Sequence, residues 1–415
     1  MPVIFHLTPS AEDHPGAGGR TRIISEARFA LGNQYRIVIV CLVPLLKFLH
    51  PIRLMQARRA LQADAKARVV YWPSLPSFGN RRLDRLLEYV RALSVLLLAK
   101  PFRVSAIHAQ GLGAATTALA CRWCGFKGAI SFDVHGASVE EHTYRTGDSD
   151  GAWVPELEAR ERAALNGADL VIYVSQRMYE HYEKKYGITP PNWVLVPCAT
   201  SAELPPDAAL RSRLRRELNL DDRFVFIYSG SYRKYQLVDE MIRLFIRIKQ
   251  QVPDAFFLIL TSHLADFQAC ANKHSLRPGD YRLLSVNRDE VLEVTQAGDV
   301  GFLLRADSVV NRVASPTKFA EYCICGVPSL ITSFVGDYSR EVAAFDLGCV
   351  VDEFEVTPDL LHFIAQVRSA RDVYAARCHD YARSHLTWDQ AGRLLREAYT
   401  GILNPERSQA VLTLQ

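Results

Sequence analysis

The sequence predicts an α/β protein made of two doubly wound parallel-sheet domains. Short apolar runs alternate with longer amphipathic stretches along nearly the whole chain. The short runs are rich in β-branched residues and apolar on both faces, which is typical of parallel strands buried between two layers of helices. At 415 residues the chain is also too long for one ordinary core, so two domains are expected.

The strands are assigned from the short apolar runs, and the helices from the stretches between them. Stretches such as 81–100 and 237–252 place apolar residues at helical spacing. Alternating strand and helix units of this kind predict a doubly wound parallel sheet. The predicted strands span residues 3–7, 35–43, 67–72, 104–110, 129–136, 168–175, 193–197, 224–230, 255–262, 281–286, 299–305, 327–332 and 348–352.

The domain limits follow from an interruption of this rhythm. Residues 198–222 are charge-rich and contain prolines, and a fresh strand begins at 224. We therefore expect one domain over residues 1–200 and a second over 201–385. A last helix is predicted within 386–415, with Trp388 and Leu395 on its apolar side.

Composition narrows the class of protein. Apolar residues make up 49% and charged residues 23% of the chain, as in soluble globular proteins. The net charge of +4 suits an anionic ligand or a membrane surface, but falls far short of a nucleic-acid-binding signature. The sequence has no apolar run of about 20 residues and no secretory leader pattern. Nine cysteines predict free thiols in a reducing compartment, so a cytoplasmic location is expected. Cys121 and Cys124 are interpreted as two thiols on a helix.

Chemistry is expected in the loops after strands, because parallel sheets bind ligands at the carboxyl ends of their strands. After the first strand, Gly16, Gly18 and Gly19 precede a helix predicted to begin near Thr21. A glycine-rich turn that enters a helix presents backbone N–H groups to an anion. A plain flexible loop is the alternative.

The strand at 129–136 ends in a second group of polar residues. Asp133 and His135 lie on the same side of the strand, and Gly136 permits a sharp turn before Glu140 and Glu141. A histidine beside a carboxylate at a strand end can act in binding or proton transfer. A structural histidine is equally consistent with the pattern.

The strand at 224–230 runs into a third group, Gly230-Ser231 followed by Arg233 and Lys234. Two cations next to a helix start can bind a diphosphate, although a solvated charge pair is the alternative. In the helix that follows, Glu240 and Arg243 are expected to form a surface pair.

The fourth group is the stretch SPTKFAEYCICGVP at 315–328. Ser315 is predicted to cap a helix with Pro316 at its first position, and the helix is expected to end near Gly326. Lys318 and Glu321 then lie on one face near the end where a phosphate would bind. The alternative is a surface ion pair worth roughly 0.3–0.5 kcal/mol.

Two further segments are candidates for binding a metal ion or a membrane. Asp148-Ser149-Asp150 has the DxD form of metal-binding motifs, but its polar, turn-rich surroundings favour a solvated loop. Residues 44–68 mix apolar and basic side chains. They fit either an anionic membrane surface or an ordinary exposed helix.

Taken together, these blocks make the sequence similar to the retaining GT-B glycosyltransferases of group 1, or family 4. The resemblance covers most of the chain in the right order, and its most specific part is SPTKFAEYxxCGxP. It runs through GAGGR, DVHG, ADLVIYVS, SGSYRKYQLVDEMI, AGDVGFLLR, SPTKFAEYCICGVPSLIT and a carboxy-terminal helix. The family's fold, two Rossmann-like domains facing a cleft with a last helix that crosses back to the first domain, is what this resemblance implies.

The resemblance also implies roles for individual residues. Arg233 and Lys234 would neutralise the leaving diphosphate, and Glu321 would bind the donor ribose. His135 would contact the transferred sugar. Gly18 and Gly19 would let donor and acceptor approach closely. Gly230, Asn311, Ser315, Pro316, Thr317 and Lys318 complete the expected donor site, and Asp133, Glu140 and Asp307 the expected sugar or acceptor site.

The sequence departs from the family pattern at two positions. The glutamate that often precedes Glu321 by eight residues is Val313, so sugar recognition must differ. Asp307, Asn311 or the backbone N–H groups of 311–314 are the candidates to replace it. The usual arginine just after Gly230 is Ser231, which makes Arg233 the expected substitute.

The expected activity is retaining transfer of a sugar from a nucleoside diphosphate sugar to a hydroxyl on a lipid-linked or saccharide acceptor. Assembly of a bacterial surface polysaccharide or glycolipid is the expected setting, with peripheral membrane contact through 44–68. No metal or other cofactor and no nucleic-acid partner is expected. A sugar-nucleotide epimerase or hydrolase of the same architecture, or a non-catalytic sugar-nucleotide-binding subunit, are the alternatives.

Overall fold

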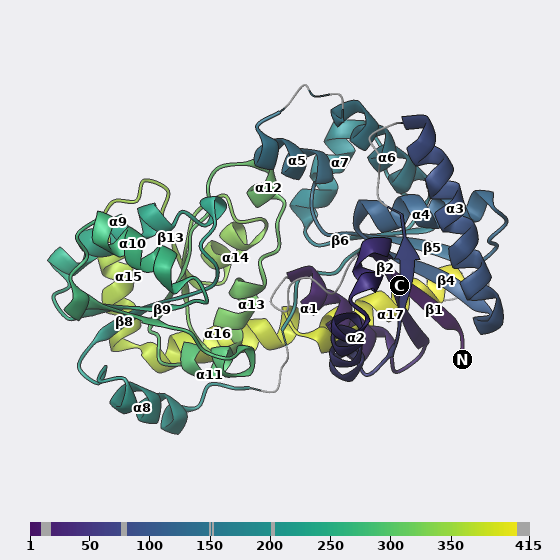
Figure 1. Ribbon diagram of the computed structural model, residues 1–415. Helices are drawn as coiled ribbons and strands as arrows, with labels where there is room; N and C mark the ends of the chain where they lie inside the picture. Colours follow the sequence, from purple (N-terminus) through teal and green to yellow (C-terminus); the bar gives the residue numbers. More distant parts are fainter. Residues whose placement is uncertain (10–17, 76–80, 149–150, 152, 201–203, 405–415) are drawn as a thin grey trace, which may run out of the picture. The chain divides into compact units, whose positions relative to one another are not determined.

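The computed structural model describes residues 1–9, 18–75, 81–148, 151, 153–200 and 204–404. Within them the chain divides into two compact units. Unit 1 comprises Met1–Pro197 and Trp388–Gln415, and unit 2 comprises Cys198–Thr387. Each unit contains one parallel sheet flanked by helices (Figure 1), which confirms the predicted fold class of two doubly wound sheets.

The sheet of unit 1 has seven parallel strands in the order β3-β2-β1-β4-β5-β6-β7. The order reverses between β1 and β4, and in open α/β sheets ligands bind at the carboxyl ends of the strands that flank such a reversal. The strands are β1 (Val3–Thr8), β2 (Arg36–Pro44), β3 (Arg68–Ser74), β4 (Val104–Gln110), β5 (Ala129–Val134), β6 (Leu170–Tyr173) and β7 (Trp193–Leu195).

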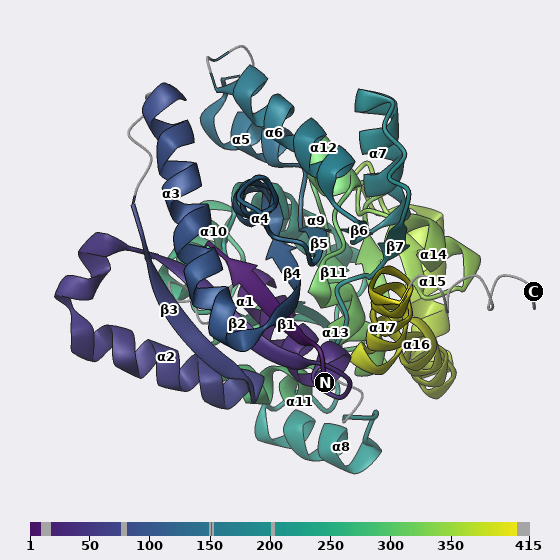
Figure 2. The same ribbon diagram turned by 90° about the vertical axis from the view of Figure 1, so that its right-hand side faces the viewer.

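Helices cover both faces of this sheet. α3, α4 and α6 pack together on one face, and α1, η1 and α17 lie on the other (Figure 2). The helices are α1 (Gly18–Ser25), η1 (Glu26–Leu31), η2 (Leu45–Leu49), α2 (Pro51–Ala65), α3 (Arg81–Ala99), η3 (Lys100–Phe102), α4 (Gly111–Trp123), α5 (Ser138–Thr146), α6 (Val154–Gly167), α7 (Gln176–Tyr186) and α17 (Trp388–Leu403).

The first helix begins at Gly18, earlier than the predicted start near Thr21. Its second half, η1, is a π-helical stretch that begins at Glu26. π-Helical turns are rare and often mark functional sites. Here the wider turn brings the Glu26 side chain, which is fully buried, into the interior of unit 1.

The last helix, α17, belongs to unit 1 although 190 residues of unit 2 separate it from β7 in the sequence. It packs on η1 and beside β7. Gly392 permits this close approach, because a Cβ there would lie 2.8 Å from the Cα of Ala30. The ring of Tyr399 is fully buried against the sheet.

The sheet of unit 2 has six parallel strands in the order β10-β9-β8-β11-β12-β13. Its order reverses between β8 and β11, so the loops after these two strands are expected to hold a ligand. The strands are β8 (Phe224–Ser229), β9 (Ala255–Leu260), β10 (Tyr281–Leu284), β11 (Val300–Leu303), β12 (Ser329–Ile331) and β13 (Gly348–Val350).

Alternate residues of β8 enter two separate apolar cores. Phe226 and Tyr228 pack with α9, α10 and α15, whereas Val225 and Ile227 pack with α11, α13 and α16. The helices of unit 2 are α8 (Ala208–Glu217), η4 (Lys234–Gln236), α9 (Val238–Gln251), α10 (Leu264–Lys273), η5 (Pro278–Asp280), η6 (Arg288–Glu290), α11 (Val291–Thr295), α12 (Val309–Arg312), α13 (Thr317–Ile324), α14 (Tyr338–Ala344), α15 (Pro358–Ser369) and α16 (Arg371–His385).

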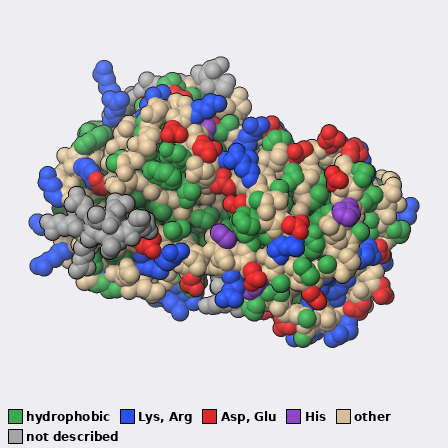
Figure 3. Space-filling model, turned by 180° about the vertical axis from the view of Figure 1, so that it is seen from behind, with side chains coloured by type: hydrophobic (Ala, Val, Ile, Leu, Met, Phe, Trp, Pro, Cys, Tyr) green, Lys and Arg blue, Asp and Glu red, His purple; other side chains and the backbone are tan. Residues whose placement is uncertain are grey.

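The surface carries charges of both signs. The face in Figure 3 shows Lys and Arg side chains interspersed with Asp and Glu, and hydrophobic side chains between them. Among the described helices, none is long and apolar enough to cross a membrane.

Candidate functional site

The loop after β8 forms the centre of a candidate site in unit 2. Gly230 adopts a φ of 152°, a backbone conformation that other residues rarely adopt. A Cβ at this position would lie 2.4 Å from both Cε and Nζ of Lys318. The glycine therefore lets the Lys318 ammonium, which α13 carries, lie directly against the turn.

Both predicted cations of this loop are free to meet a ligand. Arg233 and Lys234 are exposed, and no ion pair joins either of them to the part of the chain that the structure describes. The loop ends at Leu237, whose φ of 50° is unusual for a leucine. Such strained positions cluster at binding sites, where the surrounding structure holds them in place.

Lys318 is held below the turn by neutral groups. Its ammonium donates to Oε1 of Gln236 at 2.7 Å and lies 5.0 Å from the centre of the Tyr228 ring. The Tyr228 hydroxyl donates to the same Gln236 oxygen at 2.8 Å. Burial lowers the pKa of Lys318 well below its usual range, and the nearby Arg305 guanidinium lowers it further.

Arg305 is a second buried cation at this site. It follows β11 and is 6% exposed. Its guanidinium lies 5.0 Å from the centre of the Tyr235 ring, and its Nη1 is buried with no hydrogen-bond partner among the described residues. Burial lowers the pKa of Arg305. No role for this residue is predicted from the sequence.

Glu321 lies on the same helix as Lys318 but does not pair with it. Burial raises the pKa of the Glu321 carboxyl, although the charges of Lys318 and Arg288 act in the opposite direction. No described side chain hydrogen-bonds to this carboxylate. The alternative interpretation, a surface ion pair between Lys318 and Glu321, is therefore wrong.

The start of α13 differs from the prediction. The helix begins at Thr317 with Pro316 as its cap residue, so Ser315 is not the cap. The Ser315 hydroxyl instead lies 2.7 Å from the Tyr338 hydroxyl and accepts the N–H of Cys198 at 2.9 Å. Ser315 thus fixes the segment that leads into the helix, while Pro316 and Thr317 form its amino-terminal turn.

The candidates to replace the missing glutamate are already engaged. Asp307 binds Arg312 through both carboxylate oxygens, at 2.7 and 2.9 Å, on the surface. Asn311 is buried and donates to the carbonyl of Ala306 at 2.8 Å. Val313 is itself buried. The N–H groups of 311–314 all donate to carbonyls of the α12 segment, so they cannot serve as free donors.

A second polar centre lies in unit 1 at the end of β5. Asp133 is fully buried and accepts two hydrogen bonds from Arg22, at 2.8 and 3.0 Å. The His135 ring lies 3.1 Å from the same carboxylate, as the predicted alternation requires. Burial acts to raise the pKa of Asp133, but Arg22 and His135 outweigh it and hold the pKa well below its usual range. Asp133 therefore orients Arg22 and the partly exposed His135.

Deeper in unit 1, Glu26 meets the side chains of His6, His108 and Gln110, all fully or almost fully buried. The Gln110 amide donates to Glu26 at 2.5 Å and lies 2.8 Å from Nε2 of His108. Nδ1 of His108 lies 2.7 Å from the Tyr399 hydroxyl of α17. Burial acts to lower the pKa of His108, but Tyr399, Asp133 and Glu26 outweigh it and raise the pKa. Burial lowers that of His6.

Glu140 and Glu141 of α5 have separate environments. Glu140 binds Lys185 at 2.7 Å and His181 at 3.2 Å. Burial acts to raise its pKa, but these two partners lower it to about 2. The Glu141 carboxylate lies over Gly136, where a Cβ would be 1.8 Å from Oε1. A side chain at position 136 would displace this carboxylate.

The remaining predicted sites contribute little here. Gly18 and Gly19 form the first two residues of α1, whereas Gly16 lies outside the described residues. Ser149 and Asp150 of the DxD sequence also lie outside them. Cys121 is buried and its thiol donates to the carbonyl of Ala92, which agrees with a structural role. Glu240 and Arg243 form the predicted surface pair at 3.1 Å.

Unit 2 thus presents charged residues from two loops and one helix as a candidate site for an anionic ligand. Exposed cations follow β8, Arg305 follows β11, and α13 supplies Lys318 and Glu321. Sequence reasoning missed Arg305 in unit 2 and Arg22 in unit 1. For Arg305 the available signal was its place at the end of a buried strand, since a cation is rarely buried there without a reason.

The chain is similar to known proteins in its sequence profile and in its fold. Residues 21–204 match the sequence profile of Glycosyltransferase Family 4. No match was found among curated proteins. HepE of Anabaena, in complex with UDP, is 14% identical with a TM-score of 0.72, over 97% of this chain and 100% of that one. The same protein has also been solved with UDP-glucose.

Two other solved structures are similar at the same level. Sucrose-phosphate synthase of Thermosynechococcus elongatus is 15% identical with a TM-score of 0.67, over 96% of this chain and 98% of that one. WaaG, a glycosyltransferase involved in lipopolysaccharide biosynthesis, is 14% identical with a TM-score of 0.65, over 97% and 100%. Residues 21–204 therefore match the Glycosyltransferase Family 4 profile, and the chain has the fold of the GT-B glycosyltransferases.

Proposed function

We propose that this protein transfers a sugar from a nucleoside diphosphate sugar to a hydroxyl acceptor, with retention at the anomeric carbon. The observation that carries the proposal is the turn after β8. There Gly230 admits Lys318, and Arg233 and Lys234 stand exposed beside it. The similarity in fold to HepE, which binds UDP and UDP-glucose, supports this class of donor.

The cations would act on the leaving group. As the glycosidic bond breaks, negative charge grows on the diphosphate and the sugar becomes oxocarbenium-like. Arg233, Lys234 and the amino-terminal turn of α13 stabilise that charge, an effect that can amount to several kcal/mol. The departing phosphate oxygen takes the proton of the acceptor hydroxyl on the same face. With cations in this role, no metal ion is required.

The remaining residues would bind the donor. Glu321 accepts hydrogen bonds from the ribose hydroxyls, for which its unpartnered carboxylate is available. His135, which Asp133 orients in unit 1, contacts the transferred sugar. This division of roles leaves Asp133 as a positioning residue, since Arg22 occupies both of its oxygens.

The test is a transfer assay with a panel of nucleoside diphosphate sugars, read with and without EDTA. We expect Lys234→Ala and Glu321→Ala each to lower transfer at least tenfold, and EDTA to have no effect. NMR of the first product gives the anomeric configuration. Transfer near the wild-type level in both variants would contradict the site. Rapid donor epimerisation or hydrolysis without acceptor would favour the epimerase or hydrolase alternative.

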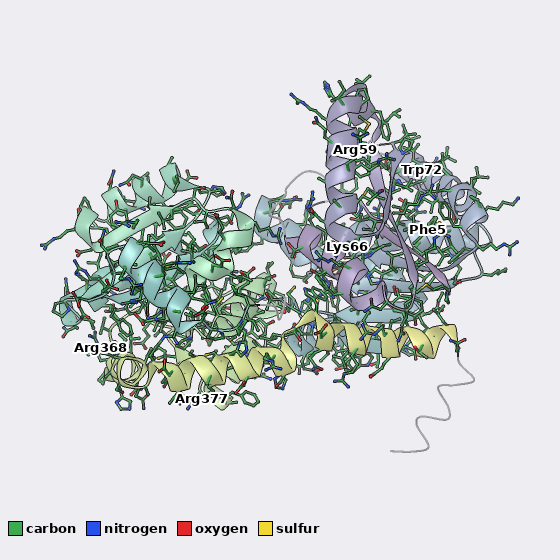
Figure 4. All side chains as sticks on the ribbon, turned by 90° about the horizontal axis from the view of Figure 1, so that it is seen from below. Phe5, Arg59, Lys66, Trp72, Arg368 and Arg377 are labelled. Carbon is green, nitrogen blue, oxygen red and sulfur yellow. The ribbon has the colours of Figure 1, made fainter. Side chains whose placement is uncertain are left out.

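We further propose that unit 1 binds an anionic membrane surface, as assembly on a lipid-linked acceptor requires. The segment η2–α2 exposes Leu46, Leu49 and Ile52 by 74%, 73% and 67%. Arg59 and Lys66, labelled in Figure 4, are two of the exposed cations of this segment. The α3 helix also exposes apolar residues, with Leu97 exposed by 72%. Exposed apolar side chains together with basic ones, as in the segment from η2 through α2, favour binding to anionic lipid.

Vesicle co-sedimentation tests this surface. The full chain should bind vesicles that contain phosphatidylglycerol more strongly than pure phosphatidylcholine vesicles. Leu46→Ser with Leu49→Ser should weaken that binding, and so should Arg58→Ser with Arg59→Ser. Arg213→Ser on α8 of unit 2, an exposed helical arginine, is the matched control. Equal binding by all variants would contradict the proposal.

A further inference from the structure

Arg305 is buried and Lys318 is partly buried in unit 2, and both contact η4, Arg305 through the Tyr235 ring and Lys318 through Gln236. Neither has an anionic hydrogen-bond partner among the described residues. Arg305 has no hydrogen bond from its guanidinium to any described residue, and its Nη1 is completely enclosed. Lys318 donates to the amide oxygen of Gln236, which is neutral. Glu321 influences Lys318 through its charge but does not hydrogen-bond to it. The local charge is therefore unbalanced.

Such an arrangement is unfavourable unless something outside the chain completes it. A buried cation without a partner loses its hydration and gains nothing in exchange, which is why buried charges in proteins are usually paired. The cation–π contacts with Tyr235 and Tyr228 return part of this loss. They leave the N–H donors of Arg305 unused, and unused buried donors indicate a missing acceptor.

We propose that Arg305 and Lys318 together bind an anionic group of the donor, and that Arg305 is a further donor-binding residue of this site. A guanidinium beside an ammonium matches the oxygens of a phosphate or a carboxylate, because the planar guanidinium can donate two parallel hydrogen bonds. Lys318 touches the Gly230 turn that also carries Arg233 and Lys234. The pair thus extends the same anion-binding surface inward. This inference rests on the proposed function, since it takes the ligand to be a nucleoside diphosphate sugar.

Two parts of such a donor can supply the anion. One is the diphosphate itself. The other is a carboxylate on the transferred sugar, as in a uronic acid. Val313 is apolar and buried where the resemblance expects a glutamate that binds sugar hydroxyls. A site that lacks this carboxylate and holds spare cations is suited to an acidic sugar. Both sources supply anionic oxygens, and binding of UDP, UDP-glucose and UDP-glucuronate distinguishes them.

The experiment measures binding to the full chain by calorimetry with UDP, UDP-glucose and UDP-glucuronate. Uridine ligands are chosen because HepE, which has the same fold, binds UDP. The variants are Arg305→Met and Lys318→Met, with Arg305→Lys to retain charge without the planar donor pair. Arg312→Met is the matched control, because Arg312 lies seven residues away and is exposed and paired with Asp307. Thermal unfolding of each variant shows whether it is folded.

If the pair binds the diphosphate, Arg305→Met and Lys318→Met should each weaken all three ligands at least tenfold. If it binds a sugar carboxylate, only UDP-glucuronate should weaken. In both cases Arg305→Lys should lose part of the affinity and Arg312→Met none. Unchanged binding of all three ligands in both Met variants, while Lys234→Ala loses UDP, would overturn the inference and leave the proposed function intact.

A further experiment distinguishes a wrong proposed function from a wrong assignment of anion binding to Arg305 and Lys318. Suppose the wild type binds no nucleoside diphosphate sugar in a wider screen, which contradicts the proposed function. Inorganic pyrophosphate then tests anion binding by Arg305 and Lys318 without the rest of the donor. Pyrophosphate binding that Arg305→Met abolishes would support this assignment, and no binding of pyrophosphate would overturn it.

Discussion

The two units bury charge in different ways. In unit 1 the carboxylates of Asp133 and Glu26 lie among Arg22 and two histidines, so opposite charges meet inside the protein. In unit 2 the cations Arg305 and Lys318 lie together with neutral hydrogen-bond partners or none. The cations and carboxylates of the first arrangement pair with one another, although Nδ1 of His6 and the side-chain oxygen of Gln110 are buried there without a hydrogen-bond partner among the described residues. In the second arrangement no described carboxylate bonds to either cation. This difference separates a cluster that holds the fold from a cluster that is suited to hold a ligand.

The largest expected effect on stability comes from breaking the charge-paired cluster around Asp133 in unit 1. Asp133→Asn leaves the buried Arg22 with Glu26 as its remaining carboxylate partner, and removing one member of a buried pair typically costs about 3–5 kcal/mol. Urea unfolding followed by fluorescence should show this loss. Asp307→Asn, in an exposed pair of unit 2, should cost less than about 1 kcal/mol. Similar losses in the two variants would mean that burial does not distinguish these pairs.

The next effect has the opposite sign. Arg305→Met removes an unpartnered buried charge, so the ligand-free protein should be equally stable or more stable, by up to about 1–4 kcal/mol. The same urea experiment measures this change. A marked loss of stability would show that Arg305 supports the fold, and would remove the contrast between the two units.

Gly230→Ala tests whether the turn after β8 holds Lys318 in place beside the cations of unit 2. The new methyl group would meet Nζ of Lys318 and adopt an unfavourable φ, with a cost of about 1–3 kcal/mol. Affinity for the donor should fall with stability, because the ammonium is pushed from the turn. Gly279→Ala is a suitable control, since no atom lies within 4 Å of a Cβ there. An unchanged affinity in Gly230→Ala would separate Lys318 from the ligand.

The smallest effect is the pH dependence of unit 1. His108 has a raised pKa in the folded protein, so its contribution is full below its unfolded pKa of about 6.5 and is lost as pH rises through the folded value. Asp133 has a lowered pKa, so its contribution is lost as pH falls below about 3.9.

Unfolding free energies across this pH range check both signs. One titrating group changes stability by at most about 1.4 kcal/mol per pH unit. His108→Asn should flatten the alkaline decline and leave the acid limb in place. The groups that face His108 are Glu26, Asp133, His6 and Tyr399, so an unchanged alkaline limb would assign the proton to one of those.

Much of the fold follows from the local pattern of apolar residues, whereas the site depends on contacts between residues that are distant in the sequence. Runs such as 104–110 and 224–230 are strands because they are apolar on both faces, and the structure places β4 and β8 there. The predicted cap at Ser315 failed because the Tyr338 hydroxyl, 23 residues away, holds that side chain instead. Because Tyr338 is distant in the sequence, the residues around Ser315 could not reveal this interaction.

Site residues are predictable where the local sequence shows their chemistry. They are not predictable where their role depends on the lack of a partner in the folded chain. Arg233 and Lys234 stand after a strand and a glycine, which is a local signal. Arg305 is informative because nothing neutralises it, and the lack of a partner is known only once the surrounding chain is placed. Conversely, Glu140 looked available but is bound by Lys185, which lies 45 residues further along.

The position of α17 affects how the chain can be assembled. Unit 2 is one continuous insertion between β7 and α17, whereas unit 1 is made of two separated pieces. During synthesis from the amino terminus, unit 2 is complete before unit 1 receives its last helix and the Tyr399 hydroxyl that reaches His108 and Ser131. All residues of unit 2 are therefore synthesised before the last helix of unit 1. Unit 2 can accordingly be cut out as one segment, and unit 1 cannot.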